Sequence, residues 1–513
     1  MDTARGIGRS TDPRAGRPPR SPSVHRDAMT AKPAALIPVG NAVLALAFIG
    51  DLSMGRPTDH SHRTAWLAAR LAAADGGDAE DCRAAHDVSL LRWSGCTANA
   101  TGFDQLLGDD VGGREQLMAM TLPIDAQRAA AIAPLAQIHC EVSGDIAVRL
   151  GMGSRVEAGL RNVFETWDGR GEPGRLAAHQ VPPVVYHVAL ASDLEILSRA
   201  RGLEPALAAI ARLGDTKYPA ALVERLARAA PDWLHALDEG AAEAPATSAM
   251  ADASGATRDV SLELIADVAD LKLPWLAGQS RQVADCAAAT GALLGLDAHA
   301  QALLRRAGLI HAMGRAAVPN HVWERAGRLS ESDWERIRLM PYWTYRAAGR
   351  IPGLKAEADL ASHAYERPDG SGYYRNLAGQ ALGPSQRVLA TAVALVALRS
   401  PRPWRPAHDA DRAAAILREQ ASTGRFDGAV VDAALAAMSG ETRRAPAKTT
   451  GPLSTREIEV LRRISLGESN KEVARVLDIS PSTVRTHIES VFRKLECSTR
   501  AAATLKAFAA GLM

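Results

Sequence analysis

The stretch of sequence that decides the fold of the C-terminal region covers residues 453–494 and reads LSTREIEVLRRISLGESNKEVARVLDISPSTVRTHIESVFRK. It contains two Ser-x-x-Glu pairs, Ser454 with Glu457 and Ser469 with Glu472, each followed by apolar residues at helical spacing. In such a capping box each side chain accepts a hydrogen bond from the backbone N–H of the other residue, which satisfies donors that the first helical turn leaves free. The pattern predicts two short helices in succession.

A third helix is predicted to begin at Ser480, because Pro481 suits the first helical position. Its apolar side chains recur at helical spacing and share one face; they are Val484, Ile488, Val491 and Leu495. The opposite face is polar and basic. Two short helices joined by a tight turn, the second with a polar face, predict a helix-turn-helix whose second helix enters the major groove of DNA. The pattern alone leaves a solvated face on a small helical bundle as the alternative.

Upstream of this region the sequence predicts two further helical modules. The 513 residues exceed one ordinary domain. Aromatic residues make up only 4%, which disfavours a β-sandwich or barrel, and apolar residues recur at helical spacing. The expected fold class is therefore all-α. The predicted divisions are a disordered tail at 1–33, a module at 34–237, a linker at 238–257, a module at 258–439, a linker at 440–452 and a four-helix domain at 453–513.

The charge and cysteine content exclude several classes of protein. The 60 basic and 58 acidic residues give a net charge of +2, so any nucleic-acid contact has to be local. Five cysteines without paired spacing argue against a disulfide framework or a zinc site and fit a reducing compartment. The apolar stretch 34–50 is interrupted by Pro38 and Gly40 and is too short for a membrane span. We expect a cytoplasmic protein without a membrane partner, whose tail is either disordered or upstream of a start at Met29.

A weak internal repeat relates the two predicted modules. Residues 165–171 read ETWDGRG and residues 366–372 read ERPDGSG. Each run is followed five residues later by a leucine and then by an apolar helical stretch. A single Asp-Gly pair is a turn signal. Two runs with the same flanks favour a duplication of one module.

Residues 453–500 resemble the LuxR-type DNA-binding domain. The resemblance implies that Arg485, Thr486 and Glu489 face base edges. It places a second group near the DNA backbone or on the same polar face, namely Lys471, Thr483, His487, Arg493 and Lys494. An arginine can read guanine through two hydrogen bonds, whereas Glu489 either accepts from cytosine or repels phosphate.

The same resemblance implies a fourth helix over residues 499–510 that dimerises, with Ala502 and Leu505 facing the partner. We expect double-stranded DNA as one partner and a second copy of the chain as another. Glu457 and Arg500 are expected to hold the domain together through internal polar contacts.

Residues 273–440 resemble HD-GYP domains, which are helical hydrolases with a centre of two or three metal ions, some of which cleave cyclic di-GMP. The resemblance rests on the runs LIHAMGRAAVP at 309–319, MPY at 340–342 and ERPDGSGYY at 366–374.

The metal ligands that this resemblance implies are largely replaced in the sequence. His311 is retained, but other residues stand at the remaining ligand positions: Gln279, Ala312, Met340, Ala364, Tyr365 and, near the late aspartate, Val393. His363 lies one position too early for the usual His pair. A binuclear site needs several imidazoles and a carboxylate that converge. We therefore expect no metal, no cofactor and no catalytic residue.

The first module resembles a more eroded copy of the same domain. Asp59-His60 matches its first helix, and Asp193 comes near the late carboxylate position. His86-Asp87 is interpreted as a coincidental His-Asp pair, and His187 is expected to have no partner that would make a site.

The sequence thus predicts a DNA-binding transcription regulator that is not an enzyme and whose HD-type modules form a sensor or oligomerisation scaffold for an unknown effector. The alternative is a metal-dependent HD-GYP phosphodiesterase for a cyclic dinucleotide, with an appended DNA-binding domain. A third possibility is a nucleotide-binding cavity without catalysis. The metal content of the purified protein and the effect of cyclic dinucleotides on its thermal stability distinguish them.

Overall fold

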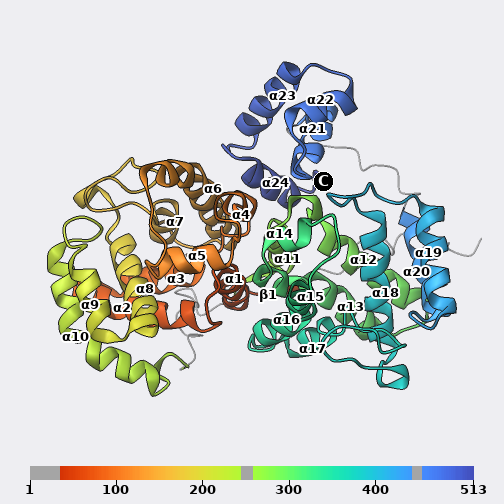
Figure 1. Ribbon diagram of the computed structural model, residues 1–513, viewed down its shortest axis with the longest axis horizontal. Helices are drawn as coiled ribbons and strands as arrows, with labels where there is room; N and C mark the ends of the chain where they lie inside the picture. Colours follow the sequence, from red (N-terminus) through yellow and green to blue (C-terminus); the bar gives the residue numbers. More distant parts are fainter. Residues whose placement is uncertain (1–34, 244–257, 442–452) are drawn as a thin grey trace, which may run out of the picture. The chain divides into compact units, whose positions relative to one another are not determined.

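The computed structural model describes residues 35–243, 258–441 and 453–513 (Figure 1). The predicted tail at 1–33 lies outside these residues, as do most of the predicted linkers at 238–257 and 440–452. Almost every described element is a helix, which confirms the expected all-α class; the exceptions are two short strands. Among the helices in these ranges, none combines the length and the apolar character that crossing a membrane requires.

The first module begins with strand β1 (Leu36–Pro38) and continues as helices. The α-helices are α1 (Val39–Ser53), α2 (His60–Ala74), α3 (Ala79–Leu91), α4 (Ala100–Leu107), α5 (Gly112–Met118), α6 (Ala126–Leu150), α7 (Ser154–Arg161), α8 (Pro183–Arg201), α9 (Leu203–Ala211) and α10 (Ala220–Asp238). Short 3₁₀ helices lie at Ala178–Gln180 and Ala241–Glu243.

The second module begins in the same way, with strand β2 (Asp259–Ser261). The α-helices are α11 (Glu263–Asp270), α12 (Gln279–Leu293), α13 (Ala298–Ile310), α14 (Asn320–Glu324), α15 (Glu331–Arg338), α16 (Met340–Ala348), α17 (Lys355–Ala361), α18 (Pro384–Arg399), α19 (Ala410–Ser422) and α20 (Gly428–Glu441). The 3₁₀ helices include η4 (Pro274–Leu276), η5 (Met313–Ala317) and η6 (Gly379–Ala381).

Equivalent contacts recur in the two modules, as the predicted duplication implies. Asp51 accepts hydrogen bonds from the backbone N–H and hydroxyl of Ser61, and Asp270 accepts the same pair from Ser280.

The two Asp-Gly loops repeat each other as well. In the first, the Glu165 carboxylate accepts from the backbone N–H of Arg175, and in the second Glu366 accepts from that of Arg375. The glycine of each loop has a positive φ, 73° at Gly169 and 78° at Gly370, which glycine adopts without strain. The two modules therefore share one architecture.

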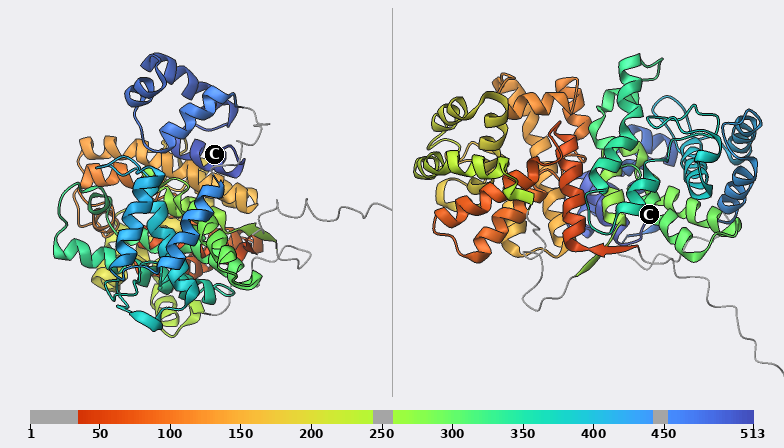
Figure 2. Two further views of the ribbon diagram at one scale, coloured as in Figure 1. Left: turned by 90° about the vertical axis from the view of Figure 1, so that its right-hand side faces the viewer. Right: turned by 90° about the horizontal axis from the view of Figure 1, so that it is seen from below.

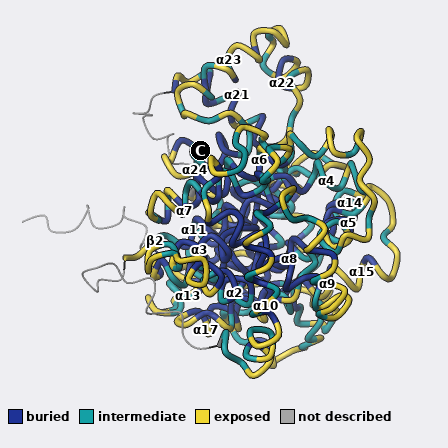
Figure 3. Tube along the Cα trace, turned by 90° about the vertical axis from the view of Figure 1, so that its left-hand side faces the viewer, coloured by how far each residue is buried: buried dark blue, intermediate teal, exposed yellow. Residues whose placement is uncertain are grey.

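The first strands of the two modules pair with each other. Leu36 of β1 lies opposite Ser261 of β2 in an antiparallel register, and the two strands lie side by side in Figure 2. Helix α1 is buried along most of its length and packs against α11, η5 and α16 of the second module. One apolar core consequently extends through both modules, visible as the dark interior in Figure 3.

A buried ion pair also joins the modules. The Lys272 ammonium lies 2.6 Å from the Asp110 carboxylate, and both side chains are fully buried. The other oxygen of Asp110 accepts from the backbone N–H of Asn320. Because an unpaired buried charge is costly, this contact helps to fix the two modules relative to each other.

The C-terminal domain consists of α21 (Thr455–Ser465), α22 (Asn470–Leu477), α23 (Pro481–Lys494) and α24 (Arg500–Ala509). Both predicted capping boxes are present, at Ser454 with Glu457 and at Ser469 with Glu472. The Ser480 hydroxyl accepts from the backbone N–H of Thr483 and caps α23. These side chains fix where each helix begins, so the turn between α22 and α23 follows from the sequence.

Candidate functional site

The polar face of α23 is exposed, as expected for a helix that reads DNA. Arg485, Thr486, Glu489 and Arg493 lie at its surface, while the predicted apolar stripe faces the core of the domain. The Arg485 side chain is 76% exposed, and its Nε donates to the Glu489 carboxylate at 2.9 Å. To bind a base edge, Arg485 would have to give up its ion pair with Glu489, which contributes little stability because it is exposed to water.

The residues predicted to lie near the DNA backbone differ in their surroundings. Lys471 and Thr483 are exposed, and the Thr483 hydroxyl hydrogen-bonds with that of Ser480. His487 is half-buried. Lys494 donates to the Glu457 carboxylate at 2.8 Å.

Glu457 and Arg500 make the internal polar contacts that the sequence predicts. Burial opposes ionisation of Glu457, but hydrogen bonds from Lys494, Ser454 and Ser490 lower its pKa to about 2. The Arg500 guanidinium donates to the Glu468 carbonyl and to the Asn470 side chain. Both residues join separate helices of the domain and therefore stabilise it.

Ala502 and Leu505, predicted to face a second copy of the chain, are fully buried within this chain. They belong to the apolar core of the HD-type modules, because α24 packs against α6 and α11. In this arrangement the two side chains are covered, so dimerisation through them requires α24 to leave the modules.

In the second module the retained histidine lies beside an arginine. His311 hydrogen-bonds through Nδ1 with the Gly308 carbonyl at 2.7 Å, and burial, with the charge of Arg315, lowers its pKa to about 3. The Arg315 guanidinium donates to the Asp270 carboxylate at 3.0 Å and reaches the Gln279 side-chain oxygen at 3.5 Å. The sequence run around His311 contained Arg315, but nothing local indicated that it would turn into this centre.

The residues of this centre do not fit the metal ions that the HD-GYP resemblance implies. Gln279 stands at the first ligand position and bonds to Arg315. The Tyr365 ring, at a former His position, lies 6.4 Å from that of His311 between centroids. A divalent cation beside a buried guanidinium would meet a like charge in a region of low dielectric. Within the described ranges no three His, Cys, Asp or Glu side chains converge in the way that metal binding requires.

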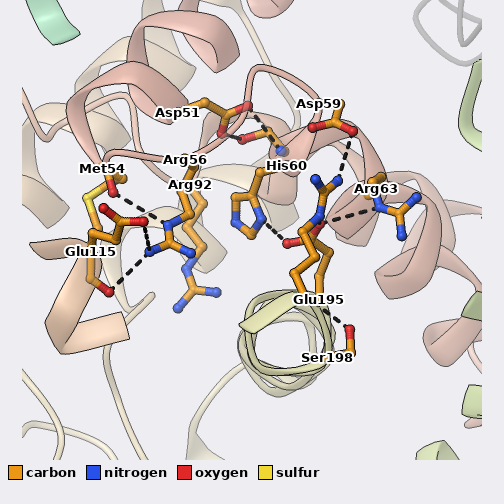
Figure 4. Close-up of polar contacts among 12 residues, drawn as sticks. Asp51, Met54, Arg56, Asp59, His60, Arg63, Arg92, Glu115, Glu195 and Ser198 are labelled. Atoms are coloured by element: carbon orange, nitrogen blue, oxygen red, sulfur yellow. Dashed lines mark hydrogen bonds and ion pairs between the residues drawn. The ribbon is translucent and has the colours of Figure 1, made fainter. Parts of the chain in front are cut away.

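The equivalent centre of the first module is a dense polar cluster (Figure 4). His60 Nδ1 donates to the Glu195 carboxylate at 2.5 Å, and both side chains are buried. Although burial opposes it, the charges of His60 and Arg199 hold the pKa of Glu195 below its usual range. Arg63 and Arg199 lie on the other oxygen of Glu195. Glu195 was missed in the sequence, because it lies in an apolar helix and its partners come from another segment.

Asp51 lies at the edge of this cluster. Burial raises its pKa to about 7, against the effects of His60 and of the two hydrogen bonds from Ser61. The His60 Nε2 atom has no hydrogen-bond partner within the part of the chain that the structure describes. The cluster is thus a set of buried, mutually compensating charges.

The other polar residues singled out in the first module also have partners. Asp193 accepts from Lys217 at 2.6 Å and from the Tyr218 hydroxyl. His187 bonds to Asp75 at 3.0 Å, a single ion-pair contact; that it takes part in no site stays a prediction. His86 and Asp87 bond to each other within α3.

Two family models match the chain. The model described as "HD domain" matches residues 263–430, and the model described as "Bacterial regulatory proteins, luxR family" matches residues 451–507. The second is supported by a relative in Mycobacterium tuberculosis, the probable transcriptional regulatory protein NarL, which is 44% identical over 70 residues, or 14% of this chain and 32% of the relative.

A longer similarity covers both HD-type modules. The 3'3'-cGAMP-specific phosphodiesterase 3 of Vibrio cholerae is 24% identical over 421 residues, which is 75% of this chain and 92% of that protein. A crystal structure of a cyclic GMP-AMP-specific phosphodiesterase of V. cholerae superposes with a TM-score of 0.56 and 22% identity, over 79% of this chain and 98% of the other. The structural similarity shows a common fold.

These comparisons contradict the expectation that the chain is not an enzyme. That expectation rested on ligand positions read one at a time from a single sequence. The similarity to the V. cholerae proteins instead extends across both modules, and the names of those proteins state a phosphodiesterase activity.

Proposed function

Because the chain carries an HD domain and a C-terminal luxR-family DNA-binding domain, we propose that it is a transcription regulator that binds double-stranded DNA as a homodimer and binds a cyclic dinucleotide in its HD-type modules. The proposed division remains two modules at 34–237 and 258–439 and a DNA-binding domain at 453–513. The observation that carries the proposal is the exposed polar face of α23, with Arg485 at its centre.

The proposed DNA contacts follow from the positions of the side chains on α22 and α23. Arg485, Thr486 and Glu489 read base edges, and Lys471, Thr483 and Arg493 contact the backbone. His487 is half-buried and serves to position α23 rather than to read a base. Lys494 reaches the backbone only after it leaves Glu457.

The proposed ligand class rests on the relatives. A cyclic dinucleotide is the molecule that the names of the V. cholerae proteins state, and the similarity includes both modules rather than one motif. The relatives also support a second candidate function, cleavage of that ligand. Among the described residues, the side chains around Arg315 and His60 form no group of three that could bind a metal ion. Cleavage therefore has to be measured directly.

The test uses the purified full-length protein in two assays. Selection of bound fragments from random DNA should enrich a two-fold symmetric motif, because a dimer reads two half-sites. Calorimetry with 3'3'-cGAMP should give saturable binding that a linear GMP-AMP dinucleotide does not match. Chromatography of the same mixtures, with and without added Mn²⁺, reports cleavage. A chain that enriches no motif is not the proposed regulator, and one that neither binds nor cleaves the cyclic dinucleotide has another ligand.

A further inference from the structure

Helix α24 contributes to two apolar cores at once. Ala503 and Ala507 belong to the core of the DNA-binding domain. Ala502 and Leu505, on the other side of the helix, belong to the core of the HD-type modules. All four side chains are fully buried. The helix is therefore an integral part of its own domain and, at the same time, the surface by which that domain docks.

Polar contacts hold the two ends of this helix to α6, against which it packs. Ahead of α24, the Glu141 carboxylate accepts from the backbone N–H of Ser498 at 2.5 Å and from its hydroxyl at 3.0 Å. Within its last turn, Lys506 pairs with Asp145 at 3.4 Å. The hydrogen bonds and the ion pair fix the position of α24 along α6, whereas a loose apolar contact would only hold the two helices close together.

A third contact comes from the second module. The Arg281 guanidinium lies over the ring of Phe508, 5.6 Å from its centroid. Gly278 supports the same contact, because a Cβ atom there would lie 2.9 Å from the Phe508 ring. The end of α24 is thus fitted to the start of α12.

The docked position also brings the DNA-reading edge of α23 toward the modules. Arg485 and Glu489 line a cavity of about 620 Å³ together with Pro134, Gln137 and Ile138 of α6. A cavity of this volume suits a small molecule. A DNA duplex needs far more space, because its major groove is about 12 Å wide and has to enclose the recognition helix.

We infer that α6 and the start of α12 form an intramolecular docking site for the DNA-binding domain. The face of α24 that carries Ala502 and Leu505 binds this site in the docked state, and it binds a second copy of the domain after release. The inference rests on the proposed function and adds its regulation. In the docked state Ala502 and Leu505 are unavailable for a dimer, and α6 lies across the cavity from Arg485 and Glu489, on the side of α23 that these two residues line. Docking and DNA binding compete, so each weakens the other by the same factor.

The first test removes the Glu141 contact and measures DNA binding by the full-length chain. Glu141→Ala should tighten binding to the selected motif by about tenfold, which corresponds to about 1.4 kcal/mol removed from the docked state. Glu224→Ala is the matched control, since it removes one exposed carboxylate from α10 without touching the docking site. Lys506→Ala, at the other end of α24, should act in the same direction as Glu141→Ala. Equal affinity of all variants and wild type would overturn the inference.

A second readout does not depend on DNA. Cys497 is half-buried between the two cores, beside Glu141, and burial raises the pKa of its thiol to about 12. Release of the domain should expose it and lower that pKa, so its alkylation should accelerate severalfold in Phe508→Ala, which loses the contact with Arg281 and removes no charge beside Cys497. Cys82, half-buried on α3, is the internal reference.

The two readouts separate failure of the docking inference from failure of the proposed function. Faster Cys497 alkylation in Phe508→Ala with no selected DNA motif would keep the docking site and reject the DNA-binding function. A selected motif with unchanged Cys497 alkylation, both among the variants and on addition of that DNA, would reject the docking site. Acceleration by both the variant and the DNA is the result that we expect.

Discussion

The guanidinium of Arg315 lies 3.0 Å from the carboxylate of Asp270, inside the centre of the second HD-type module. Both side chains are almost completely buried. Burial raises the pKa of Asp270 to about 6, and the charge of Arg315 and the bonds from Ser280 oppose that rise. The arginine thus provides the positive charge that a buried carboxylate needs.

Replacing Arg315 with Met should destabilise the protein by about 3–5 kcal/mol at pH 8, because it leaves Asp270 buried and unpaired. A carboxyl group whose pKa is higher in the folded state contributes less stability as the pH rises toward that folded value. Without Arg315 the pKa rises further, so the loss should be smaller at pH 5 than at pH 8. Urea unfolding at both values measures it, with the exposed Arg412→Ala as control. A loss that is the same at both pH values would contradict this account of Asp270.

Replacing Asp51 with Asn tests the centre of the first module. The pKa of Asp51 is about 7 in the folded protein and 3.8 for an ordinary aspartate, so the wild type loses stability as the pH rises from about 4 to 7, a loss that a neutral amide does not show. The free energy of unfolding of Asp51→Asn, taken relative to that of the wild type, should therefore be higher at pH 8 than at pH 5 by roughly 2–3 kcal/mol. Denaturant unfolding at the two pH values gives this difference. Asp59→Asn, at a more exposed carboxylate of the same cluster, should show little of it.

Replacing Glu457 with Gln should destabilise the DNA-binding domain by about 2 kcal/mol, since hydrogen bonds to a charged acceptor are lost. The folded-state pKa of about 2 lies below the usual value, so the contribution is present near neutral pH and disappears as the pH falls toward 2. Thermal unfolding at pH 7 and pH 3 should show a smaller effect at the lower value. Glu459→Gln, which removes an exposed ion pair with Arg456 on the same helix, should change little.

Replacing Arg485 with Ala should relax the preference for one base position and weaken binding by roughly 1–3 kcal/mol. Lys471→Ala should instead weaken binding to all sequences alike and reduce its salt dependence. Repeating the DNA selection with each variant, and titrating salt, distinguishes the two. A motif that Arg485→Ala leaves unchanged would remove Arg485 from the base-reading residues. Glu489→Gln tests whether that carboxylate reads cytosine. If it does, the selected motif should lose its base preference at a second position; if it does not, the motif should stay the same.

The DNA-binding domain could be predicted because its determinants are local. Ser454, Ser469 and Ser480 each mark a helix start, and the capping partners lie within three residues. The internal roles of Glu457 and Arg500 were predicted from the family resemblance and are confirmed by their contacts. The repeat was visible for the same reason, since the Asp-Gly loops are set by backbone conformation at single glycines.

The centres of the two modules could not be predicted, because their partners come from distant segments. Glu195 meets His60 from a helix far along the chain, and Lys272 meets Asp110 across the two modules. The apolar face of α24 was predicted, but its occupant was not. The helical periodicity predicts that Leu505 is covered, but it does not distinguish a partner helix from α6. Only the folded chain shows which of the two covers it.

The pairing of β1 with β2 has a consequence for how the protein is made. A ribosome releases Leu36 long before it has synthesised Ser261, the residue opposite it in the ladder. Until then the edge of β1 and the side of α1 that packs against the second module are exposed to solvent. The nascent first half therefore carries an apolar surface that can bind chaperones or misassemble. We therefore expect the two halves to fold as one cooperative unit, and expression of either half alone to yield an insoluble or chaperone-bound fragment.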